Sequence, residues 1–413
     1  MGRIRVLLLA VIALGACRPG VPSAIPTPAV TTPRLTHTST APPPSTPTSR
    51  PEPPVLAGPF RLVAPVPPEA IADLMAEIRL DLSTGAVRLL SAISLTEMAG
   101  FGWETVVADF PGVPAGIDDR GRVWVILQAG DGIAVWDDEA WRLFAAESGW
   151  SPLAEARGML TVDAAGGMWL ATGEDVRMFD GEAWTVFSRQ AMGMDPADGG
   201  DTRASFLVQP ATAMEAVWVG ECDLIGPGPA GGQGARWYDG SAWRGADSPA
   251  SSGCSLAVEE DPRGAVWVGV DDRLWSYDPA GRTWSELDLP PLGDEGRPGP
   301  FILDLAFGPR GDLWALVAIC GGASCSGNEV LLQRAGEVWR QMGEAGEFSA
   351  APVFDASGTA WLPTRAGVYQ VEGGEPVKVG DLEVVSATVD ADGRLWLAAW
   401  RGGDLGVWAQ VHE

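Results

Sequence analysis

Tryptophan recurs at nearly constant intervals along this chain of 413 residues. Seven copies of the pattern Asp-x-x-Gly-x-x-Trp, two of them degenerate, end at Trp124, Trp169, Trp218, Trp267, Trp314, Trp361 and Trp396. Successive Trp residues are 45, 49, 49, 47, 47 and 35 positions apart. A period of about 40 to 50 residues with strand-like content indicates a β-propeller with one four-stranded blade per repeat. We therefore predict an all-β fold, a seven-bladed β-propeller over residues 101–413.

Each repeat has room for four strands and their turns. In the repeat at 254–288, the segment Asp261–Gly264 is the turn between the first two strands, because Asp bonds its own backbone and Gly accepts positive φ. A second Trp recurs on the expected fourth strand, at Trp103, Trp141, Trp184, Trp243, Trp284 and Trp339. Trp side chains bury about 150–250 Å² each, so we assign both Trp series to the core between blades.

The first and last repeats are incomplete in complementary ways. Only three strands follow Val384, whereas residues 102–108 resemble a fourth strand with no partners before it. We expect residues 102–108 to complete the last blade, because closure removes exposed sheet edges. Residues 58–100 remain as a helical or irregular segment, and the apolar spacing within 68–82 predicts one short N-terminal helix packed on the ring.

The N-terminal residues indicate export and lipid anchoring. Residues 1–17 combine two early Arg with the apolar run Val6–Leu14 and end in Leu14-Gly15-Ala16-Cys17, which matches a bacterial lipobox. We expect Cys17 to carry the lipid and to be the protein's only membrane contact, on the extracytoplasmic side of a bacterial cell envelope. Residues 18–57 contain 12 Pro and are predicted to be a disordered Pro/Thr/Ser-rich tether.

The charge of the chain excludes some partners. The net charge is −26, and residues 1–57 hold five Arg and one Glu, so residues 58–413 carry −30. Such an acidic surface is unsuited to nucleic acid and to direct docking on anionic lipid. We expect a soluble monomeric propeller held to the membrane by its lipid alone.

The remaining four cysteines fit disulfides in an exported protein. Cys222 ends one strand of the third full repeat and Cys254 begins the next repeat, so both are expected at the same end of the ring. Cys320 and Cys325 share one loop. We predict the pairs Cys222–Cys254 and Cys320–Cys325. The alternative is a four-thiolate metal site, which the Cys-x₄-Cys spacing disfavours.

The repeat resembles the two-component-regulator propeller repeat of bacterial sensor proteins and of stand-alone exported proteins. The matching segments are Asp163–Leu170, Val176–Asp180 and Gly181–Trp184. The resemblance covers residues 101–413 and implies a propeller with a sensory or binding role. No kinase region or membrane-spanning segment follows the repeats in this sequence. We therefore expect any sensing to act through a partner.

Long loops are expected at one end of the ring, which we call the top face: it carries the turns between the second and third strands and the connections between blades. The longest are 145–157, 188–204, 221–234, 288–300 and 320–328. Two Trp outside the repeat pattern, Trp150 and Trp400, should lie there on neighbouring blades, with Arg365 and Arg401 nearby. Aromatic faces with Arg donors suit a carbohydrate or protein ligand; the alternative is that both Trp fold down to fill the loops.

Catalysis has little support in the sequence. His37 lies in the tether and His412 at the last strand, which disfavours the His-dependent streptogramin-lyase type of propeller that the repeat also resembles. We predict no catalytic residue, no metal and no cofactor, and a ligand-binding or protein-interaction module. The alternatives are a carbohydrate-active hydrolase or lyase that uses acidic residues, and a scaffold for envelope assembly.

Overall fold

Each intact copy of the repeat pattern forms one hydrogen-bonded turn that joins its Asp to its Trp. In the first copy, Oδ1 of Asp118 accepts hydrogen bonds from the backbone N–H groups of Arg120 (2.9 Å) and Arg122 (3.0 Å). Oδ2 of Asp118 accepts a hydrogen bond from Nε1 of Trp124 at 2.9 Å. Gly121 has a φ of 76°, which glycine adopts without steric cost. The carboxylate therefore fixes the turn and holds the Trp on the following strand.

The Asp-to-Trp hydrogen bond is present in all five intact copies. In the other four its length is 2.8 to 3.2 Å, and the pairs are Asp163–Trp169, Asp261–Trp267, Asp355–Trp361 and Asp390–Trp396. A buried indole N–H without a partner costs free energy, so the bond explains why Asp and Trp recur together at this spacing.

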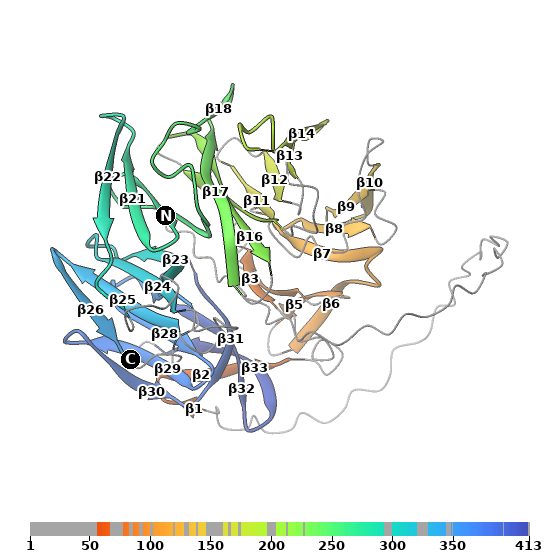
Figure 1. The fold of residues 1–413 in the computed structure, drawn as a ribbon. Helices are drawn as coiled ribbons and strands as arrows, with labels where there is room; N and C mark the ends of the chain where they lie inside the picture. Colours follow the sequence, from red (N-terminus) through yellow and green to blue (C-terminus); the bar gives the residue numbers. More distant parts are fainter. Residues whose placement is uncertain are drawn as a thin grey trace, which may run out of the picture. The chain divides into compact units, whose positions relative to one another are not determined.

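The computed structural model of the protein describes residues 56–66, 77–81, 86–90, 94–99, 102–118, 120–127, 132–137, 139–145, 160–163, 167–171, 175–195, 204–211, 214–225, 228–292, 300–319, 329–343, 348, 350–390 and 392–411. These residues form eight antiparallel sheets, seven with four strands and one with five (Figure 1). We number the sheets as blades 1 to 8 in chain order.

The first four blades follow one another along the chain. Blade 1 consists of β3 (Glu77–Asp81), β4 (Ala86–Leu90), β5 (Ser94–Ala99) and β6 (Gly102–Ala108). Blade 2 consists of β7 (Gly112–Ile117), β8 (Val123–Leu127), β9 (Gly132–Trp136) and β10 (Trp141–Ala145). Blade 3 consists of β11 (Leu160–Val162), β12 (Met168–Ala171), β13 (Asp175–Phe179) and β14 (Trp184–Ser188). Blade 4 consists of β15 (Ala204–Ala211), β16 (Ala216–Ile225), β17 (Gly228–Tyr238) and β18 (Trp243–Arg244).

The last four blades include the one that takes strands from both ends of the sequence. Blade 5 consists of β19 (Ala257–Glu260), β20 (Val266–Val270), β21 (Arg273–Asp278) and β22 (Thr283–Asp288). Blade 6 consists of β23 (Pro300–Phe307), β24 (Leu313–Ile319), β25 (Glu329–Ala335) and β26 (Val338–Met342). Blade 7 consists of β27 (Val353–Phe354), β28 (Ala360–Thr364), β29 (Gly367–Glu372) and β30 (Glu375–Gly380). Blade 8 consists of β31 (Glu383–Val389), β32 (Leu395–Arg401), β33 (Asp404–Gln410), β2 (Phe60–Pro65) and β1 (Leu56–Ala57).

Neighbouring blades share apolar cores all the way round. Eight clusters of buried side chains occur in the described residues, and each joins two successive blades. The cluster that joins blade 8 to blade 1 contains Trp396 and Val407 from one blade and Val87 and Leu89 from the other. The blades therefore form a closed ring, without a sheet face left open between the last blade and the first.

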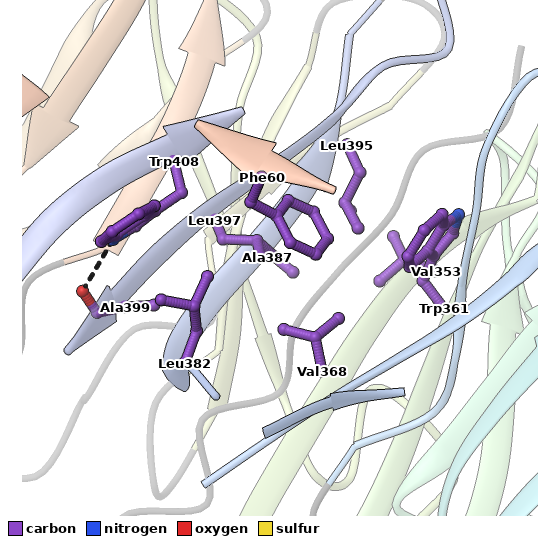
Figure 2. Close-up of a cluster of buried hydrophobic side chains, with 10 residues drawn as sticks. All are labelled: Phe60, Val353, Trp361, Val368, Leu382, Ala387, Leu395, Leu397, Ala399 and Trp408. Carbon is purple, nitrogen blue, oxygen red and sulfur yellow. Dashed lines mark hydrogen bonds between the residues drawn. The ribbon is translucent and has the colours of Figure 1, made fainter. Parts of the chain in front are cut away.

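The ring is closed by a strand from the start of the described chain. β2 pairs antiparallel with β33, with Phe60 opposite Gln410 and Arg61 opposite Ala409. Phe60 is fully buried among side chains of blades 7 and 8, and its ring meets that of Trp361 edge-on at 5.6 Å (Figure 2). Burial of this aromatic ring fixes β2 in the sheet, since apolar burial is the main stabilising term in a core.

The prediction of seven blades is wrong, because the described residues contain eight. Blade 1 escaped detection since it has no Trp on its second strand: Arg88 occupies the face that Trp takes elsewhere. Arg88 is buried, bonds Oε2 of Glu97 at 2.9 Å, and donates to the carbonyl of Gly121 in blade 2 at 2.7 Å. A paired Arg thus takes the place of the Trp, beside the apolar core that blades 1 and 2 share.

Two further expectations about the N-terminal part are also wrong. Residues 102–108 form β6, which pairs with β5 inside blade 1 and does not complete blade 8. The described end of the predicted helix at 68–82 is β3, which pairs with β4; residues 68–76 lie outside the described residues. β3 has the sequence Glu-Ile-Arg-Leu-Asp, which alternates polar and apolar residues as a strand does, and the helical spacing of the residues before it outweighed this short alternation in the prediction.

Candidate functional site

An open cleft of about 480 Å³ lies on the top face, where blades 7 and 8 meet. Blade 7 contributes Arg365 and Ala366, from the turn between β28 and β29. Asp381, in the connection from β30 to β31, and Glu383, the first residue of β31, also line the cleft. Blade 8 lines the rest of the cleft with Trp400, Arg401, Gly402 and Gly403. Turns on a rigid scaffold are where propellers and other β folds commonly bind ligands.

Local sequence fixes both turns. Arg401 and Asp404 pair across a two-residue Gly402-Gly403 turn, in which both glycines have positive φ (63° and 97°). Such a hairpin turn requires two residues that accept positive φ. In blade 7, the buried Thr364 hydroxyl donates to the carbonyl of Gly367 at 2.8 Å and accepts the N–H of Ala366 at 3.0 Å. These bonds hold the backbone that carries Arg365.

The cleft combines an aromatic face with charges of both signs. The Arg401 guanidinium lies 5.6 Å from the ring centre of Trp408, in cation–π contact. Lys378 bonds Asp381 at 2.8 Å, and this hydrogen bond holds the pKa of the Asp381 carboxyl below its ordinary value, with Arg401 adding a smaller effect. Asp381 is therefore an anion at neutral pH.

The chemistry available in the cleft is recognition of a polar ligand. Arg365 and Arg401 offer planar sets of N–H donors for carboxylate, phosphate or hydroxyl oxygens. Glu383 and Asp381 accept hydrogen bonds from hydroxyl or amino groups. The half-buried Trp400 offers an apolar ring surface beside them.

The structure brings together three of the four residues predicted as ligand-binding. Arg365, Trp400 and Arg401 all line the cleft. Trp150 lies outside the described residues. The expectation that the blade before Trp150 adjoins the blade of Trp400 is wrong, because blade 1 lies between blade 8 and blade 2. Sequence reasoning missed Asp381 and Glu383. Their only signal was a pair of acids in a short connection between two predicted strands.

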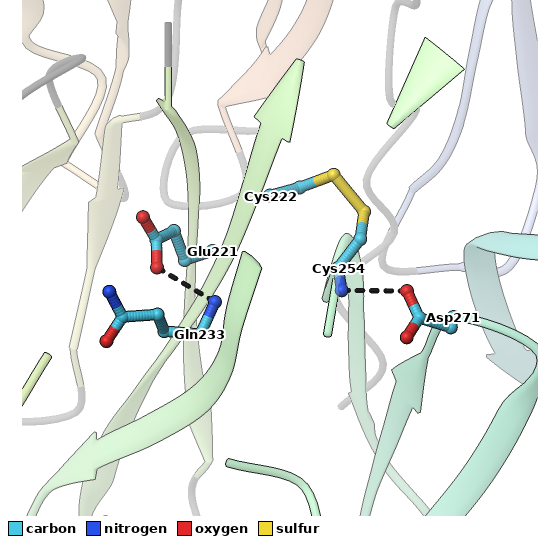
Figure 3. Close-up of a disulfide and its surroundings, with 5 residues drawn as sticks. All are labelled: Glu221, Cys222, Gln233, Cys254 and Asp271. Carbon is cyan, nitrogen blue, oxygen red and sulfur yellow. Dashed lines mark hydrogen bonds between the residues drawn. A yellow bond between two sulfur atoms is a disulfide. The ribbon is translucent and has the colours of Figure 1, made fainter. Parts of the chain in front are cut away.

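A disulfide joins Cys222 of β16 to Cys254, just before β19, as the sequence predicts (Figure 3). It links blades 4 and 5. Beside it, Glu221 is fully buried, pairs with Arg189 and accepts the backbone N–H of Gln233 at 3.0 Å. On the other side, Oδ1 of Asp271 accepts the N–H of Cys254 at 2.9 Å. Cys17, Cys320 and Cys325 lie outside the described residues.

The segment 221–234 is not the long loop that the sequence suggested. Residues 216–225 and 228–238 are the paired strands β16 and β17. The side chain of Gln233 bonds the backbone of Asp195 in both directions, at 2.5 and 3.1 Å, which ties this hairpin to the turn after β14. The hairpin is therefore a braced part of the scaffold.

Two general features of the described residues bear on the kind of site. They contain no group of three or more His, Cys, Asp and Glu placed to hold a metal ion. No helix among them has the length and apolar character needed to cross a membrane.

No protein-family model matches the chain, and no curated protein matches it. Among solved structures, it is similar to the extracellular domain of the one-component system BT4673 from B. thetaiotaomicron, at 14% identity and a TM-score of 0.41 over 83% of this chain and 52% of that one. It is similar to PorZ, a surface component of the type-IX secretion system of Porphyromonas gingivalis, at 16% identity and a TM-score of 0.38 over 78% and 55%. A catalytically inactive virginiamycin B lyase from Staphylococcus aureus matches at 12% identity and a TM-score of 0.46 over 72% and 95%.

This chain spans about half the length of the BT4673 and PorZ structures. The similarities are of fold alone, and they carry no ligand or activity over to this chain.

Proposed function

We propose that the protein is a lipid-anchored, extracytoplasmic ligand-binding module whose site is the top-face cleft between blades 7 and 8. The observation that carries the proposal is the meeting of Arg365 of blade 7 with Trp400 and Arg401 of blade 8 in one cleft. The disulfide between Cys222 and Cys254 fits an oxidising, extracytoplasmic compartment. The Leu14-Gly15-Ala16-Cys17 sequence is the basis for the lipid anchor.

The ligand that fits best is a carbohydrate segment of a few sugar units. A volume of about 480 Å³ lies within the range of small-ligand sites. The Trp400 ring can stack on the apolar face of a sugar, while the Arg and carboxylate side chains bond its hydroxyl groups. A protein segment with the same mixture of charges is the alternative ligand, and binding of an envelope protein there would favour an assembly role.

A glycan-cleaving enzyme is the second candidate function, and one observation favours it. Asp381 and Glu383 are two carboxylates on the wall of the same cleft. Glycoside hydrolysis uses such a pair, one as acid and one as base or nucleophile. Cleavage of a bound glycan that is lost in Glu383→Gln would establish this function.

The test is affinity capture with the full chain, immobilised and exposed to a panel of polysaccharides and to detergent-solubilised envelope proteins. The matched variant is Trp400→Ala/Arg401→Ala. The control is Arg263→Ala, which removes an exposed Arg from a turn on the opposite face. A ligand retained by the wild type and the control but lost by the matched variant supports the cleft. Equal retention by all three proteins would overturn this placement.

A further inference from the structure

One turn of the ring has the backbone of the Asp turn but lacks the Asp. In blade 6, Gly308 stands where the intact copies have Asp. Its N–H donates to the carbonyl of Asp312 at 2.9 Å, and the N–H of Gly311 donates to its carbonyl at 2.8 Å. The Asp118 turn makes the same two bonds at 3.0 and 2.9 Å. The loss of the carboxylate has therefore left the turn itself intact.

The donors that the carboxylate would satisfy are still in place. Trp314 is 99% buried, and its Nε1 has no hydrogen-bond partner, whereas this atom bonds Asp in all five intact copies. The backbone N–H groups of Arg310 and Asp312 occupy the positions that donate to Oδ1 in the other turns. Three donors thus surround the place of the missing carboxylate, and a buried donor without a partner is costly.

A pocket of about 380 Å³ opens at this place, on the face opposite the top-face cleft. Its wall includes Gly308, Trp314 and the half-buried ring of Phe354, which meets Trp314 edge-on at 6.3 Å. The guanidinium of Arg340 lies against Gly374 on the rim, and Arg310 lines the pocket as well. Arg310 and Asp312 are the charged residues that line the pocket, and Arg340 adds a cation at its rim, where Glu372 and Glu375 flank the Gly373-Gly374 turn.

Blade 4 also lacks the Asp of the turn, but its Trp is packed differently. Trp218 also has no Asp, and its Nε1 likewise lacks a partner. There the ring stacks on Trp237 at 4.7 Å, and Met214 packs in the same cluster. In blade 6, Trp314 lines a pocket.

We propose that this pocket is a binding site for a carboxylate group of a ligand, which takes the place that Asp fills in the intact turns. The carboxylate would accept hydrogen bonds from Nε1 of Trp314 and from the N–H groups of Arg310 and Asp312. Arg310 and Arg340 offer guanidinium N–H donors to the carboxylate at the rim. Phe354 and Pro309 provide an apolar wall for the carbon chain attached to it.

The site is independent of the top-face cleft. It is built by the turns between the first and second strands of blades 6 and 7 and by the turn between the third and fourth strands of blade 7, whereas the cleft is built at the opposite end of the blades. Binding or lack of binding at one site therefore gives no information about the other site.

The test uses the full chain with ¹⁵N-labelled Trp, so that each indole N–H gives one NMR signal, and Trp314→Phe identifies the signal of interest. Sodium acetate is titrated at constant ionic strength against sodium chloride, with acetamide as the neutral probe of the same shape. We expect acetate to shift the Trp314 signal downfield in a saturable way, and acetamide to leave it unchanged. No acetate response would mean that water fills the place, and would overturn the proposal.

Two substitutions give matched controls. Gly308→Asp restores the natural carboxylate: the added Cβ would lie 3.3 Å from Cε1 of Phe354, a ring that can shift slightly. We expect this variant to show the shifted Trp314 signal without acetate and to lose the acetate response. Asp355→Gly should create a second site, with an acetate-responsive Trp361 signal. An unchanged acetate response in Gly308→Asp would place the acetate elsewhere and contradict the proposal.

The source of the carboxylate is decided by a comparison of probes. Acetate and a blocked glutamate dipeptide are titrated separately onto the wild type. Tighter binding of the dipeptide indicates an acidic side chain of a polypeptide, and equal binding indicates a small organic acid. Both results support a carboxylate site. If neither probe binds, the proposal is contradicted.

Discussion

The buried carboxylate of Asp118 bonds the buried indole N–H of Trp124 at 2.9 Å, six residues further along the chain. The same atom, Oδ2, also pairs with Nε of Arg122 at 2.7 Å. One carboxylate thus accepts hydrogen bonds from the backbone of a turn, from an indole N–H and from a guanidinium group. This arrangement turns a sequence pattern into a structural unit that each intact repeat reuses.

Replacement of Asp118 by Ala should destabilise the protein by about 2–3 kcal/mol, because it leaves buried N–H groups without an acceptor. The measurement is the free energy of unfolding from a urea titration. The control is Asp180→Ala, in an exposed turn where Oδ1 accepts the N–H groups of Glu182 and Ala183. We expect a smaller loss there, since water can replace that carboxylate. Equal losses would contradict a special role for the Asp-to-Trp bond.

Phe60→Ala should cost about 3–5 kcal/mol, the usual range for removal of a buried aromatic ring. Phe60 is fully buried in the core shared by blades 7 and 8, so its loss leaves a cavity where β2 closes the ring. Urea unfolding measures the effect. Arg61→Ala, an exposed position on the same strand, should change stability by less than about 0.5 kcal/mol.

Loss of the disulfide should also weaken the ring. Cys222 and Cys254 are 32 residues apart, and a closed loop of that length stabilises a fold by about 3–4 kcal/mol in the chain-entropy account. The double variant Cys222→Ser/Cys254→Ser should therefore unfold at lower urea concentration than the wild type. Unchanged stability would show that this crosslink adds nothing to the Glu221 and Asp271 contacts beside it.

Asp304, on β23, should make stability fall as pH rises. Burial raises the pKa of its carboxyl from 3.8 to about 7, although the N–H groups of Ala351 and Leu305 bond it and oppose the rise. Its folded pKa exceeds its unfolded value. Its contribution is therefore fully present below about pH 4 and is lost as pH rises through about 7.

The comparison for Asp304 is with Asp304→Asn, which cannot ionise. Between pH 4 and pH 8 the wild type should lose at most about 4 kcal/mol of unfolding free energy relative to the variant. Urea titrations of both proteins across this range measure the difference. A difference that does not vary with pH would show that Asp304 ionises at its ordinary pKa in the fold.

The Trp period was enough to predict an all-β propeller, because the pattern records a packing unit that each full repeat must build. It failed at blade 1, where Arg88 replaces Trp and bonds Glu97 and the Gly121 carbonyl. A buried Arg whose hydrogen-bond partners lie outside its own turn cannot be detected by a search for a Trp pattern. The count of seven and the role given to residues 102–108 both follow from that one replacement.

The candidate cleft was predicted in part for a similar reason. Arg365, Trp400 and Arg401 lie in or beside turns between strands, and strand order predicts at which end of the ring each turn lies. Strand order also puts Asp381, between β30 and β31, and Glu383, the first residue of β31, at this end of the ring, but it does not determine which side chains meet across two blades. The pocket at Gly308 required the comparison of five intact turns with one that lacks its Asp.

The ring closes through β2, which completes the blade that carries Trp400 and Arg401. The most direct test is disulfide trapping in the full chain. The pair Arg61→Cys/Ala409→Cys joins residues opposite each other in β2 and β33, and Glu104→Cys/Ala409→Cys tests closure by residues 102–108 instead. Peptide mapping by mass spectrometry after mild oxidation should find a crosslink between positions 61 and 409, and none between 104 and 409. A crosslink only in the second variant would contradict the eight-bladed ring and restore closure by residues 102–108.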